Sequence, residues 1–329
     1  MPEAFLDYGL FLAKTITLAL IVAVPLALLL LRRRPTPTDG DRLEVTDLND
    51  RYRAMARTLR LASAPHQRLR KLLKRESRDE KQKRHALEEG KRRLFVIDFH
   101  GDIKATGVAA LREAITAVLL EARPEDEVLV RLENAGGVVS EHGLAASQLA
   151  RIRQRGIPLT IAVDKVAASG GYLMACVADR LLAAPFAVVG SIGVVAGLPN
   201  FRRLLDRSGV DFELHTAGEY KRTLTLFGEN DDAGREKIKA QLEETHGLFK
   251  AFIAEYRPAV ELERVATGEY WHATQALELG LVDQIQTSDD YLMAANEQAR
   301  ILLVKYTKKK RPMERLLSSM EGSLWRHLG

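Results

Sequence analysis

Val163-Asp-Lys-Val-Ala-Ala-Ser169-Gly-Gly-Tyr-Leu-Met-Ala-Cys176 is the most informative segment of this 329-residue chain. An apolar run at residues 159–163 predicts a buried strand before the serine, and residues 172–177 predict a helix after it. A strand, a tight turn and a helix in this order lift the Ser169 hydroxyl clear of a sheet, with the first free N–H groups of the helix facing the same place. This arrangement suits a nucleophilic serine, because those N–H groups can stabilise a developing oxyanion.

Strand and helix patterns alternate through residues 94–300 and predict a mainly parallel α/β sheet covered by helices. Strands are expected at residues 94–99, 127–132, 159–163 and 211–215, and helices at residues 107–121, 143–155, 231–256 and 274–279. Ligands bind at the carboxyl ends of the strands in such sheets. The turn at Ser169 follows one of these ends, so the sequence predicts a site there.

A second glycine pair, Gly136-Gly137, follows the strand expected at residues 127–132. Adjacent glycines let the backbone approach a substrate closely and turn N–H groups outward. Gly136 or Gly137 could supply one oxyanion donor, and the N–H of Gly170 the other. A glycine pair by itself is explained as well by a tight turn, so the argument depends on finding two such turns beside one serine.

The base that would activate the serine is left open by local pattern alone. Three histidines lie near expected strand ends or loops, namely His100, His142 and His215, and none has an obvious Asp partner in the sequence. Lys221 is the alternative, since it follows an expected strand and a glycine turn. Only about one free lysine in 10³ is neutral at pH 7, so this lysine would need burial to act as a base. A solvated charge is the simpler interpretation of any single lysine.

The N-terminal part predicts a membrane anchor. Residues 9–31 are nearly all apolar and are followed at once by three arginines. About 20 apolar residues span a bilayer, and a cleaved signal peptide would carry its positive charges before the apolar run. We therefore expect a retained transmembrane helix at residues 8–31.

Charge is divided unevenly along the chain. Residues 94–300 carry 21 Lys and Arg against 30 Asp and Glu, and the other residues carry 28 against 14. An acidic body argues against nucleic acid as a partner. The basic flanks, a linker at residues 32–93 and an amphipathic tail at residues 301–329, suit an anionic lipid surface. Solvated helices are the alternative, and the tail could equally dock on its own oligomer.

Cysteine and histidine usage predicts no metal site. The chain has a single cysteine, Cys176, within an apolar helical pattern, and this thiol is expected to be buried. The eight histidines are scattered without metal-ligand spacing. We expect no metal and no cofactor.

Five segments resemble the signal peptide peptidase A family, peptidase family S49, and within it the SohB-like branch: residues 5–14, 143–149, 160–172, 184–194 and 215–225. The resemblance implies a ClpP/crotonase-like fold and a Ser–Lys dyad. Carried over to this sequence, Ser169 is the nucleophile and Lys221 the general base. Gly136 and Gly137 match the oxyanion loop, although Ala135 stands where the family has proline. Ser191, in a matching Gly-Ser-Ile-Gly segment, is expected to orient the lysine amine.

The resemblance also implies an assembly and a location. A chain with one catalytic half is expected to form a homo-oligomer, an octamer by analogy, in which Lys221 could serve the Ser169 of a neighbour. The expected location is the bacterial inner membrane, and the expected substrates are membrane-associated peptides such as leftover signal peptides. The family places the peptidase domain in the periplasm, whereas the arginines after the anchor place it in the cytoplasm under the positive-inside rule.

Two other functions fit the same fold. A crotonase-type acyl-CoA enzyme would need neither the serine–lysine pair nor an anchor, and would show CoA-dependent activity. A non-catalytic membrane scaffold would carry both residues without using them, so a serine-directed probe would not label Ser169.

Overall fold

The computed structural model describes residue 12, residues 14–17, residue 21, and residues 41–63, 92–218 and 220–308. The chain divides into two units, Leu43–Tyr306 and the two ends outside it. No helix among the described residues is long and apolar enough to span a bilayer. Most of the expected anchor at residues 8–31, the charged linker residues 64–91 and the tail from residue 309 lie outside the described residues.

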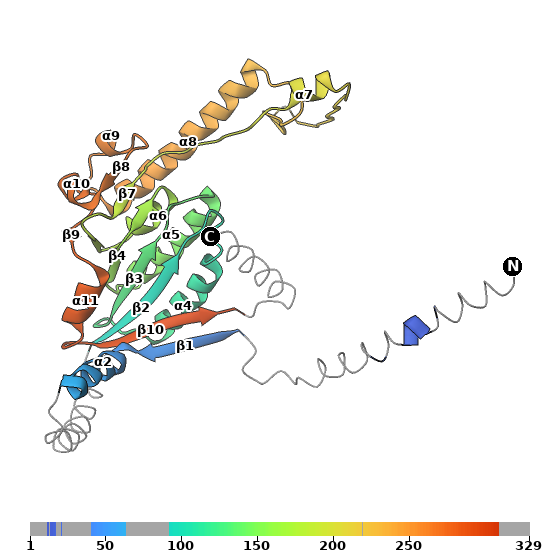
Figure 1. Ribbon diagram of the computed structural model, residues 1–329. Helices are drawn as coiled ribbons and strands as arrows, with labels where there is room; N and C mark the ends of the chain where they lie inside the picture. The colour runs from blue at the N-terminus through green and yellow to red at the C-terminus, as the bar shows by residue number, and fades with distance from the viewer. Residues whose placement is uncertain are drawn as a thin grey trace. The chain divides into compact units, whose positions relative to one another are not determined.

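A seven-stranded sheet forms the centre of the unit Leu43–Tyr306 (Figure 1). Its strands lie in the order β1 (Arg42–Asp47), β10 (Arg300–Thr307), β2 (Arg93–His100), β3 (Glu127–Glu133), β4 (Leu159–Val163), β6 (Arg180–Ala183) and β9 (Gln284–Ile285). Every neighbouring pair from β10 to β9 is parallel. The prediction of a mainly parallel α/β sheet is therefore confirmed.

Both faces of this sheet are buried, as a parallel sheet requires. Alternate residues of β2 enter different cores, since Phe95 and Ile97 belong to one cluster and Leu94 and Val96 to the other. The first core is completed by α4 (Val108–Glu121), α5 (Val139–Gln154) and α6 (Gly170–Ala175). The second is completed by α2 (Leu48–Ser63) and α11 (Ser288–Ala295). This double burial explains the nearly continuous apolar runs of β2 and β4.

A smaller sheet carries the serine turn. It consists of β5 (Val166–Ala168), β7 (Val188–Gly190) and β8 (Tyr270–His272). β5 and β7 are parallel and β8 is antiparallel to β7. An isolated bridge between Asn134 and Ala167 joins β5 to the segment that follows β3. Each strand has three residues, too few to show a period of two in the sequence.

The segment between β7 and the long helix α8 (Asp232–Tyr256) extends from the rest of the unit (Figure 1). We call residues 194–231 the arm; it contains α7 (Arg202–Arg207) and lies at the end of α8 that points away from the sheet. The rings of Phe201 and Phe212 both contact Phe227 and hold the arm together. The strand expected at residues 211–215 is wrong, because these residues are exposed and pair with no strand among the described residues.

After the arm, the helices expected at residues 231–256 and 274–279 are found as α8 and α10 (Ala273–Glu278), with the short α9 (Leu262–Val265) between them. Asp231 caps α8 by accepting a hydrogen bond from the Gly234 N–H. Arg257, just after α8, donates to both carboxylate oxygens of Asp283 and to the Gly280 carbonyl. This buried arginine fastens one end of α8 to the region before β9.

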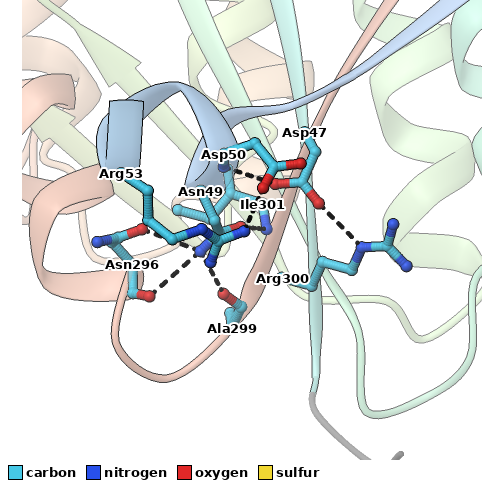
Figure 2. A network of polar contacts seen from close by, with 8 residues as sticks. All are labelled: Asp47, Asn49, Asp50, Arg53, Asn296, Ala299, Arg300 and Ile301. Atoms are coloured by element: carbon cyan, nitrogen blue, oxygen red, sulfur yellow. Dashed lines mark hydrogen bonds and ion pairs between the residues drawn. The ribbon is translucent and has the colours of Figure 1, made fainter. Parts of the chain in front are cut away.

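The compact unit begins at Leu43, not at residue 94, because β1 and α2 pack onto its C-terminal part. Figure 2 shows the contact: the buried Asn49 amide donates to the Asn296 and Ala299 carbonyls and accepts from the Ile301 N–H. Asp47 pairs with Arg300 in the same network. Residues 43–63, expected in the linker, thus belong to the body, and β10 extends the body beyond the expected boundary at residue 300. We call the contacts of Asp47 and Asn49 with residues 296–301 the clasp.

Candidate active site

Ser169 occupies a strained turn between β5 and α6. It is the N-cap of α6, with φ 51° and ψ −121°, and its N–H donates to the Gly190 carbonyl at 2.7 Å. A positive φ is uncommon for any residue other than glycine. Such strain persists only where the surroundings enforce it, and it clusters at functional sites. The strand expected at residues 159–163 is β4, but the turn follows the additional short strand β5 of the smaller sheet, and the helix after it spans Gly170–Ala175 and not residues 172–177.

The second glycine turn lies directly against this serine. Gly136 has φ 91°, and an added Cβ there would lie 2.7 Å from Ser169 Cβ and 2.8 Å from the Ala168 carbonyl oxygen. No other residue fits between the two turns without moving one of them. The structure therefore brings together the two glycine-rich strand ends that the sequence singled out.

The expected oxyanion donors differ in whether their N–H groups are engaged. The Gly136 N–H donates to Asn134 Oδ1 at 2.9 Å. The N–H groups of Gly137 and Gly170 have no hydrogen bond within the described part of the chain. Gly170 is also the first residue of α6, where N–H groups have no partner inside the helix. Gly137 and Gly170 are thus the two donors available to a substrate.

None of the three histidines is arranged as a base for Ser169. His142 is fully buried, and its ring nitrogens face the Val138 carbonyl at 2.9 Å and Asn134 Oδ1 at 3.2 Å. His100 is 72% exposed and lies 3.7 Å from Glu133. His215 is exposed on the arm, 3.4 Å from Glu213. Among the described residues, no hydrogen bond joins any of these rings to the serine hydroxyl.

Ser191 lies beside Ser169 because of strand register. β5 and β7 are paired with Ala168 opposite Gly190. The residues that follow these two strands, Ser169 and Ser191, are therefore neighbours. Ser191 has φ 52°, and its N–H donates to the Glu269 carbonyl at 2.6 Å. Two serines in strained conformations therefore follow two adjacent strands.

Lys221 lies on the arm and not beside Ser169 of the same chain. The neighbouring Tyr220 ring is 4.8 Å from the Lys237 ammonium, and the Thr223 carbonyl lies against Gly234, both in the first turns of α8. The cavity at Ser169 begins at Thr245 of that helix, about 12 Å further along the axis from Lys237 at 1.5 Å per residue. Lys221 is exposed and does not line the cavity.

The cavity next to Ser169 has a volume of about 280 Å³ and a mainly apolar wall. One side is formed by the two turns, through Ser169, Gly137 and Gly170. The other side is formed by α5, α6 and α8, through Val139, Leu173, Leu248, Phe249 and Phe252. A space of this size and polarity accepts an apolar side chain beside the serine hydroxyl.

The helix behind Ser169 is held in a rigid core. Tyr172 is fully buried and its hydroxyl donates to the Leu281 carbonyl at 2.9 Å. Cys176 is buried as expected, and burial raises the pKa of its thiol far above the usual value. The thiol therefore stays protonated and inert. No group of three His, Cys, Asp or Glu side chains in the described ranges could hold a metal ion.

Sequence reasoning missed Asn134, which lies between the glycine turn and the serine strand. Its signal was a polar residue directly after a buried strand and two residues before Gly136. Sequence reasoning also considered His142 only as a base and missed that its ring contacts Val138 and Asn134 on either side of the glycine pair.

A peptidase architecture is indicated by this site: a strained serine, two free N–H groups and an apolar cavity at the ends of parallel strands. Comparison with known proteins agrees. Residues 3–149 match the model of the peptidase family S49 N-terminal region, and residues 151–302 match that of peptidase family S49. The chain belongs to peptidase family S49.

Its relatives include proteins named as SohB proteases. "Probable protease SohB" of Haemophilus influenzae is 44% identical over 321 residues, covering 94% of this chain and 91% of the relative. The protein of the same name from Buchnera aphidicola (subspecies Acyrthosiphon pisum) is 54% identical over 238 residues, covering 72% and 71%. A solved structure of the 1510-N membrane-bound stomatin-specific protease is 16% identical, covers 62% of this chain and 84% of that chain, and has a TM-score of 0.41.

Proposed function

We propose that this S49 peptidase is a serine endopeptidase with Ser169 as nucleophile and Lys221 as general base. The observation that carries the proposal is the Ser169 turn, held at φ 51° against Gly136 and opening on an apolar cavity. A ClpP/crotonase-like fold is part of the proposal, supported by the parallel main sheet and the second small sheet that carries the serine.

The geometry supports a two-step acyl transfer. An apolar substrate side chain enters the cavity, and Ser169 Oγ attacks the adjacent carbonyl carbon while its proton passes to the neutral Lys221 amine. The carbonyl oxygen becomes an oxyanion that accepts hydrogen bonds from the Gly137 and Gly170 N–H groups. The C–N bond then breaks and the leaving amine takes the proton from Lys221. Water then attacks the acyl carbon while Lys221 takes its proton, the ester C–O bond to Ser169 breaks, and Ser169 Oγ recovers a proton from Lys221.

The position of Lys221 favours a dyad made between neighbouring copies of the chain. The lysine lies with the distal turns of α8, whereas the cavity lies near the other end of that helix. The arm also exposes apolar side chains that a second copy could cover, namely Val195, Leu198, Leu204, Val210 and Leu214. A ring of copies, an octamer by family analogy, would bring each arm to the next serine.

Mixing two inactive variants tests this arrangement. Ser169→Ala and Lys221→Ala chains would be co-expressed, with each variant alone as the baseline. In a randomly mixed ring, about a quarter of the sites combine an intact serine with a neighbour's intact lysine, so about a quarter of wild-type activity should return. A dyad within one chain would recover nothing, and this result would refute the proposed arrangement.

Labelling of Ser169 separates the peptidase from the alternatives. A fluorophosphonate should modify Ser169 in the full-length protein, and the Ser169→Ala protein should not be labelled. Peptide hydrolysis should need no CoA. Absence of labelling in a protein that elutes as an assembled oligomer would favour a scaffold, and CoA-dependent turnover would favour an acyl-CoA enzyme.

Ser191 is proposed to orient the lysine amine. Its place next to Ser169 supports this role, since an incoming lysine would meet both hydroxyls. Ser191→Ala should lower kcat, because the amine would lose the hydrogen bond that orients it toward Ser169. Wild-type activity across the whole pH profile would exclude the role.

The anchor, the inner membrane and membrane-associated peptide substrates complete the proposal, and they rest on the apolar residues 9–31 and on the family. The family and the charge bias after the anchor give opposite sides of the membrane for the peptidase domain. Protease treatment of spheroplasts decides between them: cleavage of the intact protein indicates a periplasmic domain, and protection until lysis indicates a cytoplasmic one.

A further inference from the structure

One imidazole ring joins the two ends of the glycine loop, residues 134–138. His142 is fully buried in α5, with Nδ1 2.9 Å from the Val138 carbonyl oxygen and Nε2 3.2 Å from Asn134 Oδ1. Both oxygens are acceptors, so whichever ring nitrogen carries a proton donates to the loop. A neutral ring has one N–H, so one of these two contacts is a hydrogen bond, and in either tautomer the ring spans the loop from Asn134 to Val138.

The Asn134 side chain sets the direction of the loop from inside. Its Oδ1 accepts the Gly136 N–H at 2.9 Å, and its Nδ2 lies 3.3 Å from Met174 Sδ in α6. The Gly136 N–H identifies the atom facing it as oxygen, since a donor must meet an acceptor. The Asn134 backbone accepts from the Ala168 N–H, one residue before the serine. One buried residue thus contacts both the oxyanion loop and the serine strand.

The His142 ring also fixes the spacing between the loop and the serine turn. An added Cβ at Gly170 would lie 2.5 Å from His142 Cγ, so the ring packs directly against the Gly170 backbone. Gly170 provides one of the two free N–H groups, and the loop provides the other. The ring lies behind both donors.

We propose that Asn134 and His142 are positioning residues for the oxyanion site, an inference that rests on the proposed peptidase function. By engaging the Gly136 N–H, Asn134 leaves the Gly137 N–H as the loop's donor to the substrate. His142 keeps this donor at a fixed separation from the Gly170 N–H. Both residues act through the backbone of the loop and not on the reacting atoms.

The kinetic test uses Asn134→Ala, which removes the acceptor, and His142→Phe, which keeps a ring but removes both nitrogens. Oxyanion donors act mainly in the transition state, so kcat should fall about 10- to 100-fold while KM changes less than about 3-fold. The inhibition constant of a peptide aldehyde, which forms a tetrahedral adduct, should rise by the same factor. The constant of the corresponding reduced peptide, which forms none, should stay the same.

A matched control separates positioning from general loss of packing. Asn296→Ala removes an amide contact of similar size in the clasp, away from the loop. It should lower the melting temperature without changing kcat or aldehyde binding. Equal effects of Asn134→Ala and Asn296→Ala on kcat per titrated active site would overturn the proposal.

Hydrogen exchange of the loop decides the matter independently of catalysis. In the full-length protein, the Gly136 amide should exchange slowly, and Asn134→Ala should speed its exchange with no change in α4. Slow exchange in the variant would refute the proposal even if the enzyme is active. Failure of the peptidase function would be seen differently, as wild-type protein whose Ser169 is not labelled.

Discussion

The serine turn and the arm contain the two proposed halves of one active site, and they are built in opposite ways. Around Ser169, backbone and side chains are almost all buried: α6 is enclosed, Tyr172 and Cys176 have no exposed surface, and two glycines are needed for the turns to fit. The arm carries Lys221 among exposed residues, and Val195 is 92% exposed. A core holds the nucleophile and oxyanion donors in place before substrate arrives, whereas the base depends on what covers the arm.

Removing either member of the proposed dyad, Ser169 or Lys221, is the most direct test of this comparison and should have the largest effect. Ser169→Ala and Lys221→Ala should each lower kcat at least about 10⁴-fold, because removing one of two residues that act as a unit costs about as much as removing both. Neither change should alter the melting temperature by more than a few degrees. Peptide hydrolysis and thermal melts measure both, with Lys239→Ala on the exposed face of α8 as a lysine control. Equal activity of Lys221→Ala and Lys239→Ala would exclude Lys221.

Breaking the contacts that attach α8 to the body should have the next largest effect, a loss in the free energy of unfolding. Arg257 is 9% exposed and donates to both Asp283 carboxylate oxygens and to the Gly280 carbonyl, so Arg257→Ala removes three hydrogen bonds and should lower the free energy of unfolding by about 2–3 kcal/mol. Arg264→Ala removes an exposed pair with Glu261 and should cost less than about 1 kcal/mol. Denaturant titrations compare them, and equal losses would show that α8 is not fastened at this end.

Charges on the arm should disrupt assembly while leaving the body folded. Val195→Glu with Leu204→Glu should reduce both the oligomer fraction and the activity about 100-fold, because charges are depleted from interface cores. Leu120→Glu is the matched control, since Leu120 is 80% exposed on α4 in the body. Sedimentation velocity measures the assembly. Dissociation caused by Leu120→Glu, but not by the arm variant, would place the interface on the body.

A buried carboxylate of the body gives the smallest effect and a pH signature. Burial disfavours the charged form of Asp126, but hydrogen bonds from the Arg93 side chain and from backbone N–H groups outweigh it and hold its pKa below the usual value. A lowered folded-state pKa stabilises above the unfolded pKa of about 3.9, and this stability disappears as the pH falls through the folded pKa.

Asp126→Asn should therefore lower the free energy of unfolding at pH 7 by about 1–3 kcal/mol. The difference from wild type should shrink as the pH falls below about 4. Urea titrations at pH 7 and pH 3 measure it, with Asp232→Asn as a control whose exposed ion pair with Arg235 should give a much smaller difference. A constant difference at both pH values would contradict the expected pKa.

Periodicity in the sequence predicts the elements that are long and lie in the centre of the sheet. The buried runs of β3 and β4 and the stripe of α4 give clear patterns, and they place the Ser169 and Gly136 turns at neighbouring strand ends. The strand expected at residues 211–215 failed because an apolar alternation needs a partner strand, and the described part of the chain offers none. Three-residue strands such as β7 give no pattern.

The clasp and the Asn134–His142 link could not be predicted for a different reason. The clasp depends on one polar side chain finding backbone partners far away in the sequence, as Asn49 does with Ala299 and Ile301. The Asn134–His142 link depends on two side chains meeting across a loop whose path the sequence does not give. Such partners follow from the three-dimensional path of the chain. A polar residue directly after a buried strand, like Asn134, is the one local sign of such a contact.

The clasp also has a consequence for biosynthesis. Asn49 and the strand before it finish their hydrogen bonding only on residues 296–301, near the other end of the chain. At 5–20 residues per second, the ribosome needs on the order of tens of seconds to make the intervening 250 or so residues. During this interval Leu48 lacks the part of its core that α11, β10 and the segment between them supply, namely Leu292, Ala295, Ala299 and Ile301. The N-terminal β1–α2 segment, although synthesised first, therefore completes its packing last. In a chain truncated before β10, this segment would stay accessible to proteases.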